Sequence, residues 1–204
     1  MKIGLNLKRD RPDNVAVLAI DLITDFSFKD GSAIRRAAKQ CESAILRLLT
    51  RARAAGVPVI YVNDNYGLWR SDAPQLVDAF SVTPLGGEFV ASLAPEPGDL
   101  IVLKPRHSAF FGTPLEPLLE SLQIGKLVLA GISAESCVWM TACDAHTRDY
   151  KLIVPMDTMA SSSPKALNAT LTGLRTTLGA RTPRGQASVR FKQWPASRRG
   201  QMPS

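Results

Sequence analysis

Short apolar runs alternate along this chain with longer segments of helical periodicity. Residues 15–20 (Val-Ala-Val-Leu-Ala-Ile) form a continuous apolar run of strand length, typical of a strand buried on both faces of a parallel sheet. Residues 33–54 carry an apolar stripe at helical spacing, and Gly56 and Pro58 follow as a common helix exit. Residues 57–62 are then a second strand, so this region predicts a strand–helix–strand unit.

The same alternation continues to residue 178. Further strands are predicted at residues 100–103, 127–130 and 151–155. Further helices are predicted at residues 74–80, at 113–122 with Thr113 as N-cap, after Gly131, and at 164–178. Residues 81–99 contain Pro, Gly and acidic residues, and we expect a connection with little regular structure. The pattern predicts a single-domain, doubly wound α/β fold, with a mostly parallel sheet and helices on both faces.

Three reactive side chains stand where predicted strands end. Asp21 and Lys104 directly follow apolar runs, and Cys137 lies beyond Gly131, near the first turn of the next helix. A parallel sheet brings such ends to one edge, where open α/β sheets bind ligands. Each residue also has an ordinary interpretation: a turn acid or helix cap for Asp21, a solvent-facing lysine for Lys104, and a buried thiol for Cys137.

A cysteine with an acid and a lysine is a plausible nucleophilic set. Asp21 could accept the thiol proton, while Lys104 and the helix N-terminus would favour the thiolate. Backbone N–H groups before Cys137 could bind an oxyanion. His146 lies nine residues further along the helix, about 13 Å away, which is too far for a base. His107 is expected in the pocket wall or in contact with substrate.

The segment that follows the second strand has binding capacity. It reads NDNYGLWRSD over residues 63–72. Asn63 and Asp64 could hold a polar group of the substrate, and Trp69 could wall a pocket. A surface loop without a binding role is the alternative.

The net charge of +7 comes mostly from the end of the chain. Residues 181–204 contain six basic and no acidic residues, which leaves 19 basic and 18 acidic residues in the remainder. The same residues are rich in Pro, Gly, Ser and Gln, so we expect a flexible basic tail after a domain of residues 14–180 and an N-terminal arm of residues 1–13. A weak electrostatic partner of the tail is the alternative. No nucleic-acid partner is expected.

Other site classes have little support. Three cysteines without CxxC spacing and two histidines argue against disulfides and structural zinc, and fit a cytoplasmic protein. The first strand is not followed by a Gly-rich turn that would bind phosphates. No apolar run reaches the length of a membrane span, and residues 1–14 lack the apolar core of a secretory signal. We therefore expect no metal, no cofactor and no membrane association.

Three separated motifs resemble the isochorismatase-like cysteine hydrolases. They are VAVLAIDLITDF around Asp21, LKPRHSAFFGTPL around Lys104 and LVLAGISAESCV around Cys137. The resemblance covers roughly residues 14–180. It implies a sheet of about six strands, a homodimer or homotetramer, and an Asp21–Lys104–Cys137 triad. It also implies a cis peptide bond at Ile132–Ser133 that directs the N–H groups of Ser133 and Cys137 toward the oxyanion.

Departures from the family pattern narrow the expected activity. Nicotinamidases of this family bind a metal through histidines in the segment equivalent to 61–72, which here contains none. Isochorismatase itself cleaves an enol ether without a nucleophilic cysteine. Cys137 therefore predicts a metal-free amidohydrolase that cleaves a C–N bond of a small amide or carbamoyl compound through a thioester. Vinyl-ether hydrolysis and a non-catalytic binding or scaffold role are the alternatives.

Overall fold

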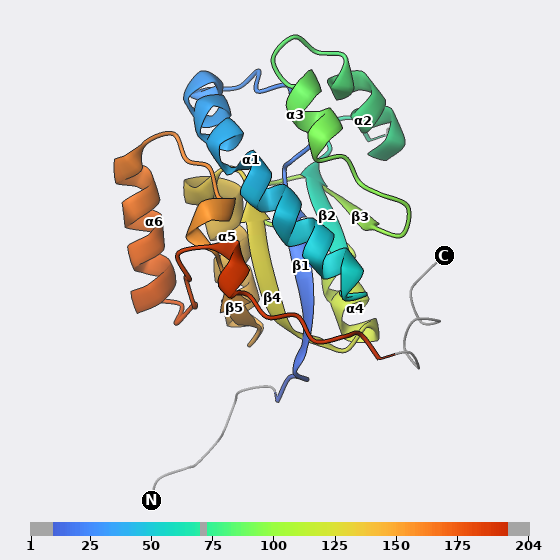
Figure 1. Ribbon diagram of the computed structural model, residues 1–204, viewed down its shortest axis with the longest axis vertical. Helices are drawn as coiled ribbons and strands as arrows, with labels where there is room; N and C mark the ends of the chain where they lie inside the picture. Colours follow the sequence, from blue (N-terminus) through green and yellow to red (C-terminus); the bar gives the residue numbers. More distant parts are fainter. Residues whose placement is uncertain (1–9, 70–72, 196–204) are drawn as a thin grey trace, which may run out of the picture.

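A five-stranded sheet lies at the centre of the computed structural model, which describes residues 10–69 and 73–195 (Figure 1). The strands are Asn14–Ile20 (β1), Val59–Asp64 (β2), Leu100–Lys104 (β3), Ile124–Gly131 (β4) and Lys151–Ile153 (β5). The α-helices are Gly31–Ala54 (α1), Ala73–Ser81 (α2), Gly87–Ser92 (α3), Leu115–Ser121 (α4), Trp139–Thr147 (α5) and Pro164–Thr176 (α6). Shorter helical turns are Ala134–Val138 (η1), Met156–Thr158 (η2) and Gln186–Ser188 (η3).

The strands are all parallel and lie in the order β3-β2-β1-β4-β5. The chain winds outward from β1 to β3 and then returns to the other side of β1 with β4. This reversal confirms the predicted doubly wound topology and places a switch point between β1 and β4. The described residues form five strands rather than about six. Beside β5, Arg181 makes a single parallel bridge with Ile153 instead of a further strand.

Alternate residues of the strands supply the cores on the two faces of the sheet. Val17 and Ala19 of β1 pack with α1 and α3, whereas Leu18 and Ile20 pack with α4, α5 and α6. Figure 1 shows α1 lying across one face of the sheet. Burial on both faces explains the continuous apolar run of the strand. None of the helices in the described ranges combines the length and apolar character that crossing a membrane requires.

Two predicted elements differ from the structure. The connection predicted at residues 81–99 contains α3, whose Phe89 is fully buried and packs edge-on against Phe26. This short helix depends on tertiary packing, which a local pattern does not report. At α4, Pro114 rather than Thr113 takes the N-cap position, although the hydroxyl of Thr113 accepts a hydrogen bond from the Leu115 N–H (3.2 Å).

The prediction of a flexible tail from residue 181 is wrong for residues 181–195, while residues 196–204 lie outside the described ranges. Val189 and Trp194 are buried, and the Trp194 N–H donates to the Ala55 carbonyl (2.8 Å). Arg51 of α1 donates to the Gln186 backbone carbonyl (2.8 Å) and to its side-chain oxygen (2.7 Å). Two apolar anchors and one arginine therefore hold a segment of mostly polar composition against α1.

The N-terminal arm also contacts the domain. Residues 1–9 lie outside the described ranges, but Arg11 donates to the Arg148 carbonyl (2.6 Å). The guanidinium carbon of Arg11 lies 3.7 Å from the centre of the Tyr150 ring. The end of the arm is therefore held beside the start of β5.

Gly131, at the end of β4, is the position where β1 and β4 approach most tightly around the switch point. Its φ is +137°, and a Cβ built there would lie 2.0 Å from the Ile20 carbonyl oxygen. That oxygen accepts a hydrogen bond from the Ile132 N–H (3.0 Å), so the backbone there has no room to move. A glycine is required for this contact.

We expect Gly131→Ala to lower the free energy of unfolding by at least about 2 kcal/mol, because it adds both backbone strain and a collision. Gly179→Ala is the matched control, since Gly179 also has a positive φ (+61°) but no atom within 4 Å of an added Cβ. Urea unfolding of both variants measures the difference. Equal losses in the two variants would show that the collision with Ile20 has no effect.

Candidate active site

Asp21 occupies the first position after β1. Its backbone is left-handed (φ 50°), and its N–H continues the sheet by donating to the Val62 carbonyl (3.0 Å). Its carboxylate oxygen Oδ1 accepts a hydrogen bond from the Asp64 N–H (2.8 Å), and the residue is only 8% exposed. Non-glycine residues with such backbones are concentrated at functional sites.

Lys104 ends β3 and is fully buried. Its ammonium lies 2.9 Å from Asp21 Oδ2, 3.7 Å from Asp64 Oδ2 and 3.8 Å from Cys137 Sγ. Strand β2 separates β3 from β1, so the long lysine side chain reaches past the paired residue Asp64 to Asp21. A buried ammonium requires such partners.

The charges of this pair depend on burial and on each other. Burial raises the pKa of the Asp21 carboxyl, and the Lys104 ammonium opposes this rise without cancelling it. Burial alone would lower the pKa of Lys104, but the negative charges of Asp21, Cys137 and Asp64 together with the hydrogen bond to Asp21 outweigh it, and the pKa is raised. Lys104 is therefore a permanent cation at neutral pH, beside a carboxylate that is more basic than usual.

Cys137 lies in η1, a π-helical turn rather than the start of an ordinary α-helix. Its sulfur is near both Lys104 Nζ and His107 Nδ1, the latter at 3.9 Å. Burial and the negative charge of Asp21 raise the pKa of the Cys137 thiol to about 12, although Lys104 opposes the shift. The charge of Lys104 thus favours the thiolate, while burial and Asp21 favour the protonated thiol.

The turn between β4 and η1 presents its backbone to this cluster. The Ile132–Ser133 peptide bond is cis, at the position that the family resemblance indicated. The Ala134 N–H donates to the Ala160 carbonyl (2.7 Å) and so is unavailable to a ligand. Within the described ranges, the Ser133 N–H donates to no protein acceptor. Ser133 is therefore a candidate oxyanion donor.

Two of the four predicted substrate contacts lie at the site. His107, in the loop after β3, is exposed and contacts the sulfur. The Asp64 side chain is 35% exposed next to Lys104, and its Oδ1 accepts a hydrogen bond from the Tyr66 N–H (2.7 Å). Both side chains can therefore contact a molecule bound at Cys137.

The other two do not lie at the site. Asn63 is fully buried, donates to the Ile23 carbonyl (3.0 Å) and accepts from the Ile23 N–H (2.9 Å). The prediction of a substrate contact by Asn63 is wrong, because its amide fixes the loop after β1. Trp69 is 79% exposed in the loop after β2, so it forms no pocket wall within one chain.

One neighbour of the cysteine was not predicted. Glu135 in η1 accepts a hydrogen bond from the Ser162 N–H (2.8 Å), which connects the cysteine turn to the segment before α6. Burial alone would raise the pKa of Glu135, but the hydrogen bonds from Ser162 outweigh it and lower the pKa. In the sequence, Glu135 is only an acid in the first turn of a predicted helix. Such acids are common, so this position did not indicate a role beside the cysteine.

Metal binding has no donor cluster in residues 10–69 and 73–195. No three His, Cys, Asp or Glu side chains there are grouped so that they could hold an ion. His146, the second histidine of the chain, lies on α5 and lines a cavity away from this cluster.

Comparisons with known proteins identify the family to which this chain is similar. The isochorismatase domain matches residues 15–183. The isochorismatase family protein YaaI of Bacillus subtilis is 34% identical over 163 residues, which cover 80% of this chain and 90% of that protein. Maleamate amidohydrolase of Pseudomonas putida is 35% identical over 115 residues, which cover 52% of this chain and 54% of that protein.

A solved structure of a related protein has a similar fold. The crystal structure of N-carbamoylsarcosine amidase from Thermoplasma acidophilum has a TM-score of 0.66 and 25% sequence identity, and it covers 86% of this chain and 98% of that one. The resemblance inferred from the three motifs is thereby confirmed. The chain belongs to the isochorismatase family.

Proposed function

We propose that the protein is a cysteine-dependent amidohydrolase that needs no metal and cleaves a C–N bond of a small amide or carbamoyl compound. The observation that carries this proposal is the contact of the Cys137 sulfur with Lys104, which is itself paired with the buried Asp21. The names of two relatives, maleamate amidohydrolase and N-carbamoylsarcosine amidase, support the bond type. Neither name determines the substrate of this chain.

The first step of the proposed reaction forms the thioester. Asp21 accepts the thiol proton of Cys137 while the sulfur attacks the carbonyl carbon, and the carbonyl π electrons move to oxygen. The N–H groups of Ser133 and Cys137 donate to that oxyanion. When the oxyanion collapses, the C–N bond breaks and protonated Asp21 gives its proton to the leaving nitrogen.

The second step restores the thiol. Water attacks the thioester carbon while Asp21 accepts a proton from it, the C–S bond breaks, and the proton passes back to sulfur. The products are ammonia or an amine and the corresponding acid. The raised pKa of Asp21 suits a group that must both accept and donate the same proton.

Lys104 stabilises the negative charge in both of its positions. Before proton transfer the charge lies on Asp21, 2.9 Å from the ammonium, and as the proton leaves it develops on the Cys137 sulfur, 3.8 Å from the ammonium, on its way to the carbonyl oxygen. Because the cation is near both positions, moving the charge requires little reorganisation.

We also propose that the protein forms a homo-oligomer, as the family resemblance implies. Leu68, Trp69 and Phe111 are exposed apolar side chains at 54%, 79% and 59%. They lie in loops that follow the neighbouring strands β2 and β3, at the edge that carries the triad. A second copy covering these loops would bury the exposed ring of Trp69.

A screen of amides, ureas and carbamates for ammonia release should identify a substrate. Replacing the nucleophile by Cys137→Ala should then lower kcat by at least about 1000-fold. Cys143→Ala is the matched control and should leave kcat unchanged. Residual activity of Cys137→Ala within about tenfold of wild type would exclude the sulfur as nucleophile.

Asp21→Asn should lower both the apparent pKa of the Cys137 thiol and the rate of turnover. Removing the carboxylate removes the repulsion that disfavours the thiolate, so the apparent pKa for alkylation of Cys137 should fall from about 12. Turnover should also fall, by about 100-fold or more, because the base is lost. Peptide-level mass spectrometry of iodoacetamide labelling gives the pH profile, and Cys41, with a pKa of about 11, is an internal control. A wild-type profile that levels off below pH 8, which is about the pKa of an ordinary thiol, would contradict the site description.

His107→Asn should raise KM by about tenfold and change kcat by less than about threefold, because we assign His107 to substrate binding. The pH profile of kcat/KM should keep its shape, since Asp21 carries the proton. His146→Asn, which changes the other of the chain's 2 histidines, is the control. Loss of one limb of the profile in His107→Asn alone would assign proton transfer to His107 instead.

A further inference from the structure

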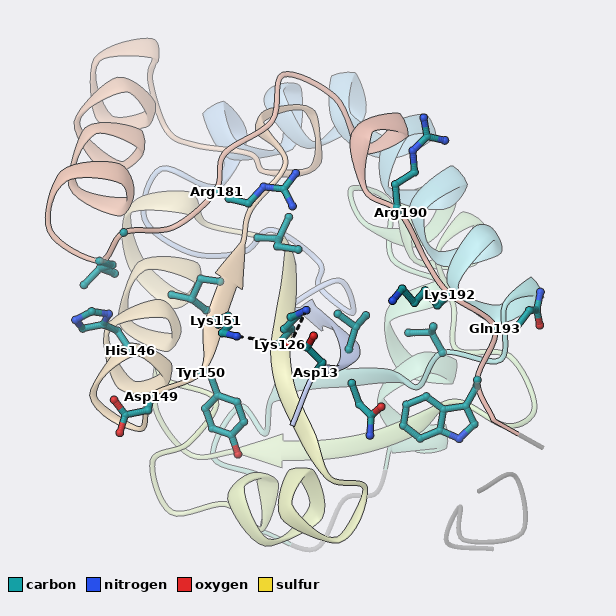
Figure 2. Close-up of a pocket in the computed structure, with 18 of the residues that line it drawn as sticks. Asp13, Lys126, His146, Asp149, Tyr150, Lys151, Arg181, Arg190, Lys192 and Gln193 are labelled. Carbon is teal, nitrogen blue, oxygen red and sulfur yellow. Dashed lines mark ion pairs between the residues drawn. The ribbon is translucent and has the colours of Figure 1, made fainter. Parts of the chain in front are cut away.

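A second cavity lies at the sheet edge opposite the triad. Its volume is about 1060 Å³, and its lining includes residues near the amino ends of β1, β4 and β5 together with Arg190 and residues 192–195 (Figure 2). Asp21, Lys104 and Cys137 lie beyond the carboxyl ends of the strands, so the two sites do not share residues. A cavity of this size can accept a small molecule.

The side chains around this cavity are mostly basic. The lining includes two acids, Asp13 and Asp149, and five side chains that are cationic at neutral pH: Lys126, Lys151, Arg181, Arg190 and Lys192. Three of the five belong to the basic segment 181–195, which the structure folds against the domain. Three of the six basic residues of 181–204 therefore lie around a hollow.

Part of this charge has no counter-ion in the described chain. Asp13 lies 2.8 Å from the ammonium of Lys126 and 3.5 Å from that of Lys151. Within residues 10–69 and 73–195, no acidic side chain forms an ion pair with Arg181, Arg190 or Lys192. Figure 2 shows Lys126 and Lys192 pointing into the cavity from opposite sides, with Arg181 above them and Arg190 pointing outward. Lys126 of β4 and Lys192 of the basic segment thus face one space, which Arg181 also lines.

The cavity floor strengthens the attraction for an anion. Val15, Ile153 and Leu178 contribute half-buried apolar side chains to the lining. Apolar side chains next to mostly cationic ones lower the local dielectric constant and strengthen the field of the cations. The carboxylate of Asp13 is paired with Lys126, whose hydrogen bond and charge lower its pKa.

We propose that this basic cavity binds a small phosphorylated anion with at least two negative charges. Arg181 offers a planar guanidinium, which binds phosphate oxygens in a bidentate manner, and Lys126 and Lys192 add point charges across from it. The oxygens of neighbouring phosphates can reach separate cations, which a single carboxylate cannot do. This inference does not depend on the hydrolase function, since it uses none of the residues assigned to that function.

Isothermal titration of the full chain with inorganic tripolyphosphate tests the proposal. We expect one site per chain, with an affinity that falls as salt is raised, because the contacts are ionic. The double variant Arg181→Glu with Lys192→Glu should weaken binding by about tenfold or more. The matched control is Arg36→Glu with Lys165→Glu, which makes the same change in net charge at exposed positions outside the cavity lining. This control should keep an affinity within about twofold of wild type.

Titrations with other anions distinguish a site for phosphate groups alone from a site for a nucleotide. ATP binding as tightly as tripolyphosphate supports recognition of phosphates alone, and tighter binding of ATP supports a nucleotide ligand in the same cavity. Equal losses in the double variant and its control would overturn the proposal, as they indicate attraction to net charge. Tighter binding of a hexaglutamate peptide would overturn the choice of phosphate. The proposal would also be overturned if wild type does not bind tripolyphosphate and the double variant changes oligomeric state in sedimentation. That pair of results would make the cavity a contact between copies of the chain.

Discussion

The ion pair of Lys104 with Asp21 is the interaction on which the site depends. A fully buried ammonium is costly unless acceptors are fixed around it, and here Asp21 Oδ2 lies at 2.9 Å and Asp64 Oδ2 at 3.7 Å. Because these acceptors follow β1 and end β2, the position of the lysine requires the ends of three adjacent strands to be in register. Removing either partner would leave a buried charge without compensation, so the site and the sheet edge stabilise each other.

The doubly wound topology explains how residues so far apart in sequence meet. Strand β1 is central, with Lys104 arriving from the β2–β3 side and Cys137 from the β4 side. The tight contact of Gly131 with Ile20 brings the cysteine turn against the end of β1. At the opposite edge, the amino ends of β1, β4 and β5 meet the folded basic segment. One sheet therefore presents an edge that carries the triad and an edge that is mainly cationic.

The sequence was sufficient to predict the order of the strands along the chain, the doubly wound class and the meeting of Asp21, Lys104 and Cys137. Each depends on apolar runs of strand length, which are strong local signals. The role of Asn63 was not predictable, because an amide at a strand end reads the same whether it binds a ligand or the Ile23 backbone. The high pKa of the thiol was also missed, since it follows from burial next to Asp21. The folded segment 181–195 depends on two apolar anchors that a mean composition hides.

The central claim is that the sulfur of Cys137 becomes acylated during turnover. Acid quenching during the steady state with the amide or carbamoyl substrate, followed by peptide mass spectrometry, tests it directly. A thioester should appear as the mass of the acyl or carbamoyl group on the peptide that contains Cys137, and hydroxylamine added during turnover should divert that group to a hydroxamate. Turnover that continues with an unmodified Cys137 peptide and forms no hydroxamate would contradict a covalent mechanism at this site.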